Sequence, residues 1–154
     1  MLRITLAALH LVALGLGVSS VLARGTALRE TPTRESFRRV FRADLIWGIA
    51  AALWIVTGLW RLFAETEKTV TFYFANHFFL TKMALLVVIL AIELWAAITL
   101  GRWRRAIGRG ESPETVYSPN VARRIATISH VEATLVIIMV FLAVAMARGF
   151  GSVG

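Results

Sequence analysis

The stretch NHFFLTKMALLVVILAIELW, residues Asn76–Trp95, decides the fold class. These 20 largely apolar residues are about as many as an α-helix needs to cross the hydrocarbon core of a bilayer. The stretch also carries Lys82 and Glu93, which are 11 residues apart and therefore expected on one face of a helix. Ionisable groups inside a membrane usually face the interior of a helix bundle, so this face is the first indication of where function resides.

The composition extends the membrane interpretation to the whole chain. Of its 154 residues, 58% are hydrophobic and 17% are charged, and the mean hydropathy is +0.72. These values are too apolar for an ordinary soluble domain. The length and the lack of a linker predict a single domain over residues 1–154. The chain has no cysteine, which excludes disulfides, thiolate metal sites and cysteine nucleophiles.

Four apolar segments predict four membrane-spanning helices, at about residues 4–23, 44–62, 77–100 and 125–147. The first segment also resembles a signal peptide, because Arg3 precedes it and Val21-Leu22-Ala23 resembles a cleavage site. His10 in the middle of the segment is unusual for a signal sequence, so we expect a retained helix. A short surface helix is expected over residues 32–41, after the capping sequence around Thr33. In the second segment, the small residues near Gly48 and Gly58 predict the face that packs against other helices.

The basic residues predict the orientation of the chain in the membrane. Residues 24–42 and 101–124 each contain six arginines, whereas Lys68 is the lone basic residue of the short polar loop over residues 64–75. The positive-inside rule therefore places both arginine-rich connections in the cytoplasm and both termini outside. The net charge of +8 then indicates topology and contact with the lipid bilayer, and a nucleic-acid partner is not expected.

Counting residues along the predicted helices groups the polar side chains of the spans into two layers. At about 1.5 Å per residue, His10 and Lys82 lie at matching depths of roughly 7–9 Å from the outer surface. The outer layer is basic or neutral and consists of His10, Arg61, His77 and Lys82. The inner layer is mostly acidic and consists of Asp44, Glu93, His130 and Glu132.

Simpler interpretations accompany several of these residues. Asp44 also fits a helix N-cap, Arg61 a cation that extends to the membrane surface, and His77 an interfacial residue at a helix start. Glu132 and His130 are two residues apart, so they cannot share one narrow helix face.

His10 and Lys82 are the strongest candidates for a binding site because neither is at a helix end. A neutral imidazole in an apolar bundle suits an axial ligand of haem iron, and a nearby cation suits a propionate. His10 is therefore the candidate iron ligand for haem b, with Lys82, His77 and Arg61 as further candidate cofactor-binding residues.

The sequence resembles a bacterial four-helix membrane family catalogued as domain of unknown function 2214. The resemblance rests on Arg42-Ala43-Asp44, Gly48, Gly58 and Arg61, on Tyr73 with Asn76-His77-Phe78-Phe79 and Lys82, and on Arg102-Trp103-Arg104-Arg105. It covers most of the chain and implies a multi-pass protein of the bacterial inner membrane.

More distantly, Ala8-Leu9-His10 and Lys82 resemble HemJ-type protoporphyrinogen oxidases and CopD-like membrane proteins. This resemblance implies a haem-associated bundle with His10 and Lys82 as key residues. The chain departs from the HemJ type at Leu80, where that type has a histidine, and at Glu93, where it has another polar residue.

We therefore expect an all-α, integral membrane four-helix bundle with three hypotheses for its function. The first is binding of haem b or a related tetrapyrrole in the outer half, and any enzymatic activity would be that of an oxidoreductase on a tetrapyrrole. The second is an accessory subunit of a larger membrane complex, whose other subunits would be its partners. The third is a small transporter or proton path along the face of Lys82 and Glu93.

Overall fold

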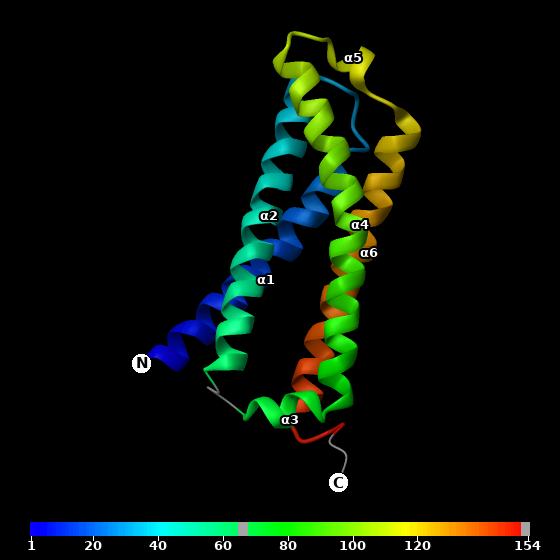
Figure 1. Cartoon of the computed structure of the whole chain (residues 1–154). Coiled ribbons are helices and arrows are strands. Elements are labelled where there is room, and N and C mark those ends of the chain that lie inside the picture. Colours follow the sequence, from blue (N-terminus) through cyan, green and yellow to red (C-terminus); the bar gives the residue numbers. More distant parts are fainter. Residues whose placement is uncertain (65–67, 152–154) are drawn as a thin grey trace.

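Each apolar segment forms one long helix in the computed structural model, which describes residues 1–64 and 68–151 (Figure 1). The long helices are α1 (Leu2–Ala27), α2 (Arg34–Phe63), α4 (His77–Gly108) and α6 (Pro119–Ala147). Among the described residues, these four are long and apolar enough to cross a membrane. They contain 26 to 32 residues, or about 39–48 Å of helix, so each extends beyond a hydrocarbon core of about 30 Å.

The helices are longer than the sequence predicted. The expected surface helix over residues 32–41 is the beginning of α2, since Thr33 caps that helix and no break separates the two segments. Thr33 and Ser36 form a capping box, in which the Ser36 N–H donates to Thr33 Oγ1 at 3.1 Å and the Thr33 N–H donates to Ser36 Oγ at 2.9 Å. The basic connection predicted over residues 101–124 is likewise mostly helical, because α4 continues to Gly108 and α6 begins at Pro119.

Two short helices lie at opposite ends of the bundle. Helix α3 (Val70–Phe74) lies near the N-terminus and the end of α6, and we call this the terminal end (Figure 1). Residues 65–67, in the predicted polar loop before α3, lie outside the described residues. Helix α5 (Pro113–Val116) lies at the other end, which we call the arginine-rich end.

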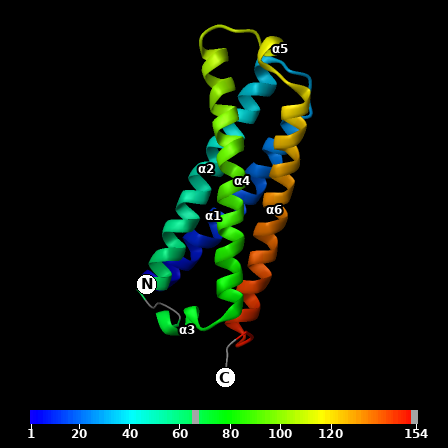
Figure 2. The ribbon, with the colours of Figure 1, turned by 45° about the vertical axis from the view of Figure 1, so that its right-hand side comes forward.

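The long helices form two antiparallel pairs, α1 with α2 and α4 with α6, and α1 also packs against α6. Figure 2 shows α4 and α6 side by side along their length. Helices α2 and α4 make few contacts with each other. In both views the first turns of α1 lie beside the end of α2 and away from the end of α6. The two pairs therefore diverge at the terminal end.

The interior is built from alanine, large aliphatic and aromatic residues in three clusters. The predicted packing face of α2 holds at Gly58, where an added Cβ would lie 3.2 Å from His10 Cε1. It fails at Gly48, which is exposed, whereas the neighbouring Trp47 is buried. The expectation for Gly48 was wrong because its α-carbon faces open space, while Trp47 packs on Gly17, where an added Cβ would lie 3.1 Å from the indole ring. Large apolar side chains remain exposed on all four long helices, as expected of surfaces that face lipid.

Candidate functional site

The diverging helix pairs enclose a pocket of about 440 Å³ at the terminal end, which we call the histidine pocket. This volume lies in the range of about 300–1,000 Å³ that is usual for pockets binding small organic ligands. All four long helices and α3 contribute to the lining. Its basic side chains are His10, Arg61, Lys68 and Lys82, its aromatic side chains are Trp54, Phe72, Tyr73 and Phe79, and its methionines are Met83, Met139 and Met146.

His10 is held against α2 by a hydrogen bond that indicates its tautomer. Its Nδ1 lies 2.9 Å from Thr57 Oγ1, and the Thr57 hydroxyl donates to the Leu53 carbonyl at 2.7 Å. Because the single hydroxyl proton is used in that bond, we infer that His10 Nδ1 carries a proton and donates to Thr57. The neutral imidazole then has its lone pair on Nε2, the form that ligates metals.

The charged side chains that line the histidine pocket in the described structure are all basic. Arg61, Lys68 and Lys82 line it, and none of the described lining residues is acidic. Lys82 lies in an apolar surrounding and has no ion pair with a described carboxylate. The arrangement suits a ligand that has an apolar body and an anionic group.

His77 is placed away from this pocket. It is the first residue of α4, its side chain is exposed, and its backbone N–H donates to the Gly151 carbonyl at 3.0 Å. The neighbouring Asn76 is fully buried, caps α4 and donates to the Phe150 carbonyl. The structure therefore brings His10, Arg61 and Lys82 of the outer layer together and leaves His77 outside.

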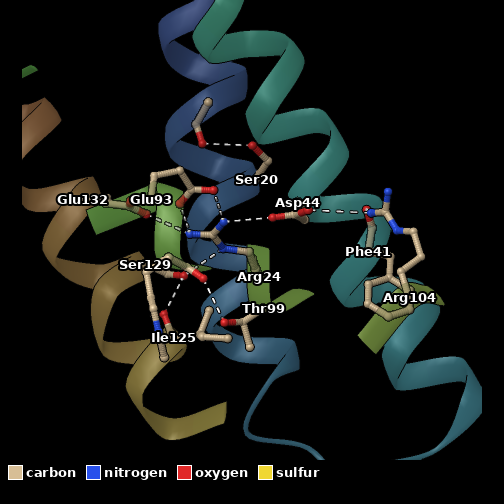
Figure 3. A network of polar contacts seen from close by, with 12 residues as sticks. Ser20, Arg24, Phe41, Asp44, Glu93, Thr99, Arg104, Ile125, Ser129 and Glu132 are labelled. Carbon is tan, nitrogen blue, oxygen red and sulfur yellow. Dashed lines mark hydrogen bonds and ion pairs between the residues drawn. The ribbon is translucent and has the colours of Figure 1, made fainter. Parts of the chain in front are cut away.

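A second polar site lies in the half of the bundle nearer the arginine-rich end, around the guanidinium of Arg24 (Figure 3). Five hydrogen bonds use all five of its N–H groups. Nε donates to Ser129 at 3.0 Å, Nη1 to Asp44 at 3.0 Å and to Glu93 at 2.7 Å, and Nη2 to Glu93 and to Glu132 at 2.8 Å each. We call Arg24, Asp44, Glu93, Ser129 and Glu132 the arginine cluster.

The arginine cluster joins the four long helices and contains most of the predicted inner layer. Asp44 is on α2, Glu93 on α4, and Glu132 with Ser129 on α6. The side chains of Arg24 and Glu132 are 0% exposed. His130, which was predicted in the same inner layer, lies outside the cluster on another face of α6 than Glu132, with its Nδ1 2.6 Å from the Ala126 carbonyl and its ring against Gly25.

Arg24 was assigned to a loop from the sequence, and that assignment was wrong. It lies one turn before the end of α1, and three carboxylates within the bundle compensate its charge. The sequence contained one indication of its position. Arg24 follows His10 by 14 residues, which is close to four helical turns, so both lie on nearly the same face of α1. The sequence analysis also did not identify three residues of these sites, because no pattern distinguishes them from other residues of their type. They are Thr57, Lys68 and Ser129.

An apolar layer separates the two polar sites. It is formed by Val21 on α1, Trp47 on α2, Ile89 on α4, and Ala133, Val136 and Met139 on α6. Lys82 and Glu93 thus belong to different sites on one helix.

The fold and the placement of these groups define a multi-pass, all-helical membrane protein with polar side chains in its interior. The sequence model of a family described as Predicted membrane protein (DUF2214) matches residues 2–151. The chain therefore belongs to the DUF2214 family, as its resemblance to that family predicted. No curated protein and no solved structure matches the chain.

Proposed function

We propose that this membrane protein binds an amphipathic organic anion in the histidine pocket, and that haem b or a related tetrapyrrole is that ligand. The observation that supports the proposal is an apolar pocket of about 440 Å³ lined by one histidine and three cationic side chains. A tetrapyrrole with propionate groups combines a large apolar ring with carboxylates, which matches both properties of the lining.

The donor set of the pocket fits haem. The hydrogen bond to Thr57 fixes the ring of His10 and leaves Nε2 as the basic nitrogen. Lys82 and Lys68 supply cations for the carboxylates. A thioether is a known second ligand of haem iron, and Met83, Met139 and Met146 line the same pocket.

Bound haem would supply redox chemistry at its iron, and the described residues would bind it, orient it and limit the access of water. Oxidation of a tetrapyrrole is the activity implied by the HemJ resemblance for such a site. The hypothesis of an accessory subunit of a larger complex has no support from any contact among the described residues. The proton-path hypothesis has less support because the apolar layer around Trp47 and Ile89 interrupts the polar groups.

The test is an absorption spectrum of the purified full-length protein, recorded as isolated and after titration with haem b. We expect a Soret band that the variant His10→Ala loses. The matched control is His77→Ala, which removes an exposed histidine outside the pocket and leaves the band unchanged. Lys82→Met weakens haem binding by roughly tenfold, the loss expected when a charged hydrogen bond is removed.

Two results would contradict the proposal. One is a spectrum with no haem band at any haem concentration that saturates known haem proteins. The other is a Soret band of equal position and intensity in wild type and His10→Ala, because that haem would be bound elsewhere.

A further inference from the structure

The arginine cluster contains more negative than positive groups. Arg24 is fully buried and pairs with Asp44, Glu93 and Glu132. Among the described residues, the one further cation that pairs with these carboxylates is Arg104 of α4, whose Nη2 lies 3.7 Å from Asp44 Oδ2 and whose side chain is 46% exposed. With all three carboxyl groups ionised, the cluster has a net charge of −1 even when Arg104 is included. An uncompensated charge is costly inside a membrane.

Two of the carboxylates share one nitrogen of the guanidinium. Glu93 Oε2 and Glu132 Oε2 each lie 2.8 Å from Arg24 Nη2. Glu93 also binds Nη1 and so forms the bidentate pair that arginine favours with an ionised carboxylate. Glu132 has a single bond to Arg24, and Figure 3 shows its carboxyl group pointing into the cluster beside Glu93. The two groups would repel each other if both were ionised.

The second oxygen of Glu132 lacks a hydrogen-bond donor in the part of the chain that the structure describes. Oε1 is buried and has no hydrogen-bond partner among the described residues, and the Glu132 side chain is 0% exposed. Arg24 cannot supply the missing bond, because its five N–H groups are already used. His130, the other titratable group on this part of α6, directs Nδ1 to the Ala126 carbonyl. A buried carboxylate oxygen without a donor is unfavourable, whereas a carboxylic acid brings its own proton.

We propose that the arginine cluster is a proton-binding site in which Glu132 is a carboxylic acid and its O–H donates toward Glu93. The proton removes the excess charge: Arg24 then balances Glu93, and Arg104 balances Asp44. It also makes Glu132 Oε1 a hydrogen-bond donor and ends the repulsion on Nη2.

The geometry favours a proton over a metal ion as the ligand of this site. The guanidinium of Arg24 occupies the centre of the three carboxyl groups, and the described residues contain no group of three or more acidic or histidine side chains arranged to hold a metal ion. Glu93 and Asp44, whose side chains are 18% and 16% exposed, both bind Arg24 Nη1, and Asp44 also pairs with the partly exposed Arg104. We therefore expect the proton to exchange with solvent from the arginine-rich end.

The first measurement is an infrared spectrum of the full-length protein in lipid nanodiscs at neutral pH. We expect a carbonyl stretching band of a protonated carboxyl group that shifts in deuterium oxide. The variant Glu132→Gln loses this band. The control Glu114→Gln, which changes an exposed glutamate on α5, retains it.

The second measurement compares thermal stability. Glutamine is a neutral isostere of the carboxylic acid and its amide can donate to Glu93, so Glu132→Gln keeps its Tm within about 3 °C of wild type. Glu93→Gln removes the ionised partner of Arg24 and lowers Tm by roughly 10 °C.

Three results would overturn the proposal. The first is a wild-type spectrum without the band of a protonated carboxyl group. This is the spectrum expected if Glu132 is ionised and its Oε1 binds a water molecule. A band that persists in Glu132→Gln assigns the proton to another residue. A Glu132→Gln variant that melts as low as Glu93→Gln, or that fails to fold, shows that Glu132 acts as an anion.

Discussion

Arg24 shows how a membrane interior holds a full charge. Its guanidinium is fully buried, and every one of its N–H groups has an acceptor from the three other long helices. Arginine has five donors in fixed directions in one plane, so it can satisfy all the acceptors of the cluster at once, whereas the ammonium group of lysine has three donors. Arg24 is therefore the residue on which the packing of all four helices depends.

We predict that Arg24→Lys destabilises the protein although it keeps the charge. Lysine has three donors in place of five, so at least two acceptors in the cluster lose their bonds, at a cost of about 2–4 kcal/mol. Reversible unfolding in mixed micelles measures this change. The control is Arg29→Lys, at an exposed arginine just beyond α1, which should have little effect. Equal stability of the two variants would contradict the role of Arg24.

His10 and His77 show what residue type and depth leave undetermined. Both are histidines in the outer half of the predicted bundle, but His10 faces α2 and the pocket, whereas His77 starts α4 and faces outward. The depth count placed them within a few residues of each other. The two residues differ in the direction of their side chains, which the depth count does not predict.

Among the elements, α1 has the central role because it contacts both α2 and α6 and carries Arg24 and His10. Its close approach to α6 depends on Gly25. A Cβ at this position would lie 3.0 Å from His130 Cε1 and 3.2 Å from Ser129 Cβ. Both neighbours are held by other bonds, His130 to the Ala126 carbonyl and Ser129 to Arg24.

We predict that Gly25→Ala destabilises the protein by about 1–3 kcal/mol, the usual effect of overpacking a tight interface. The matched control is Gly48→Ala on α2, where no atom lies within 4 Å of the added Cβ. Alanine in an open helix interior should gain about 0.5–1 kcal/mol over glycine. The two variants should therefore change the unfolding free energy in opposite directions, and a stabilising Gly25→Ala would show that α1 and α6 can separate.

At the scale of the whole molecule, the two ends differ in charge. The arginine-rich end carries most of the arginines, in residues 24–42 and 101–124, whereas the loop at the terminal end that contains α3 has Lys68 as its basic residue. This asymmetry predicts that the arginine-rich end is cytoplasmic and that the histidine pocket lies in the outer half of the membrane.

Single-cysteine labelling tests this orientation, because the chain has no cysteine of its own. The variants Thr71→Cys at the terminal end and Ser112→Cys at the arginine-rich end both place the thiol at an exposed position. In intact bacterial cells, a membrane-impermeant maleimide should label Cys at position 71 and should label position 112 only after permeabilisation. The reverse pattern would place the arginine-rich end outside.

The membrane class, the four spanning segments, the all-α bundle and the family could all be predicted from the amino-acid sequence. These properties depend on local hydropathy, on helix length and on motifs that are read residue by residue. The sequence also paired His10 with Lys82, because depth along a straight helix follows from counting residues.

Which polar groups contact each other became clear from the three-dimensional structure and not from the sequence. Counting along the chain treated Arg24 as a loop cation, since hydropathy cannot distinguish an arginine that extends to the surface from one that turns inward. It grouped His130 with the acidic residues and His77 with His10, although neither belongs to the site that the structure shows. Contacts between helices depend on their rotation and crossing, and these are fixed by packing such as Trp47 on Gly17 and Gly25 on His130.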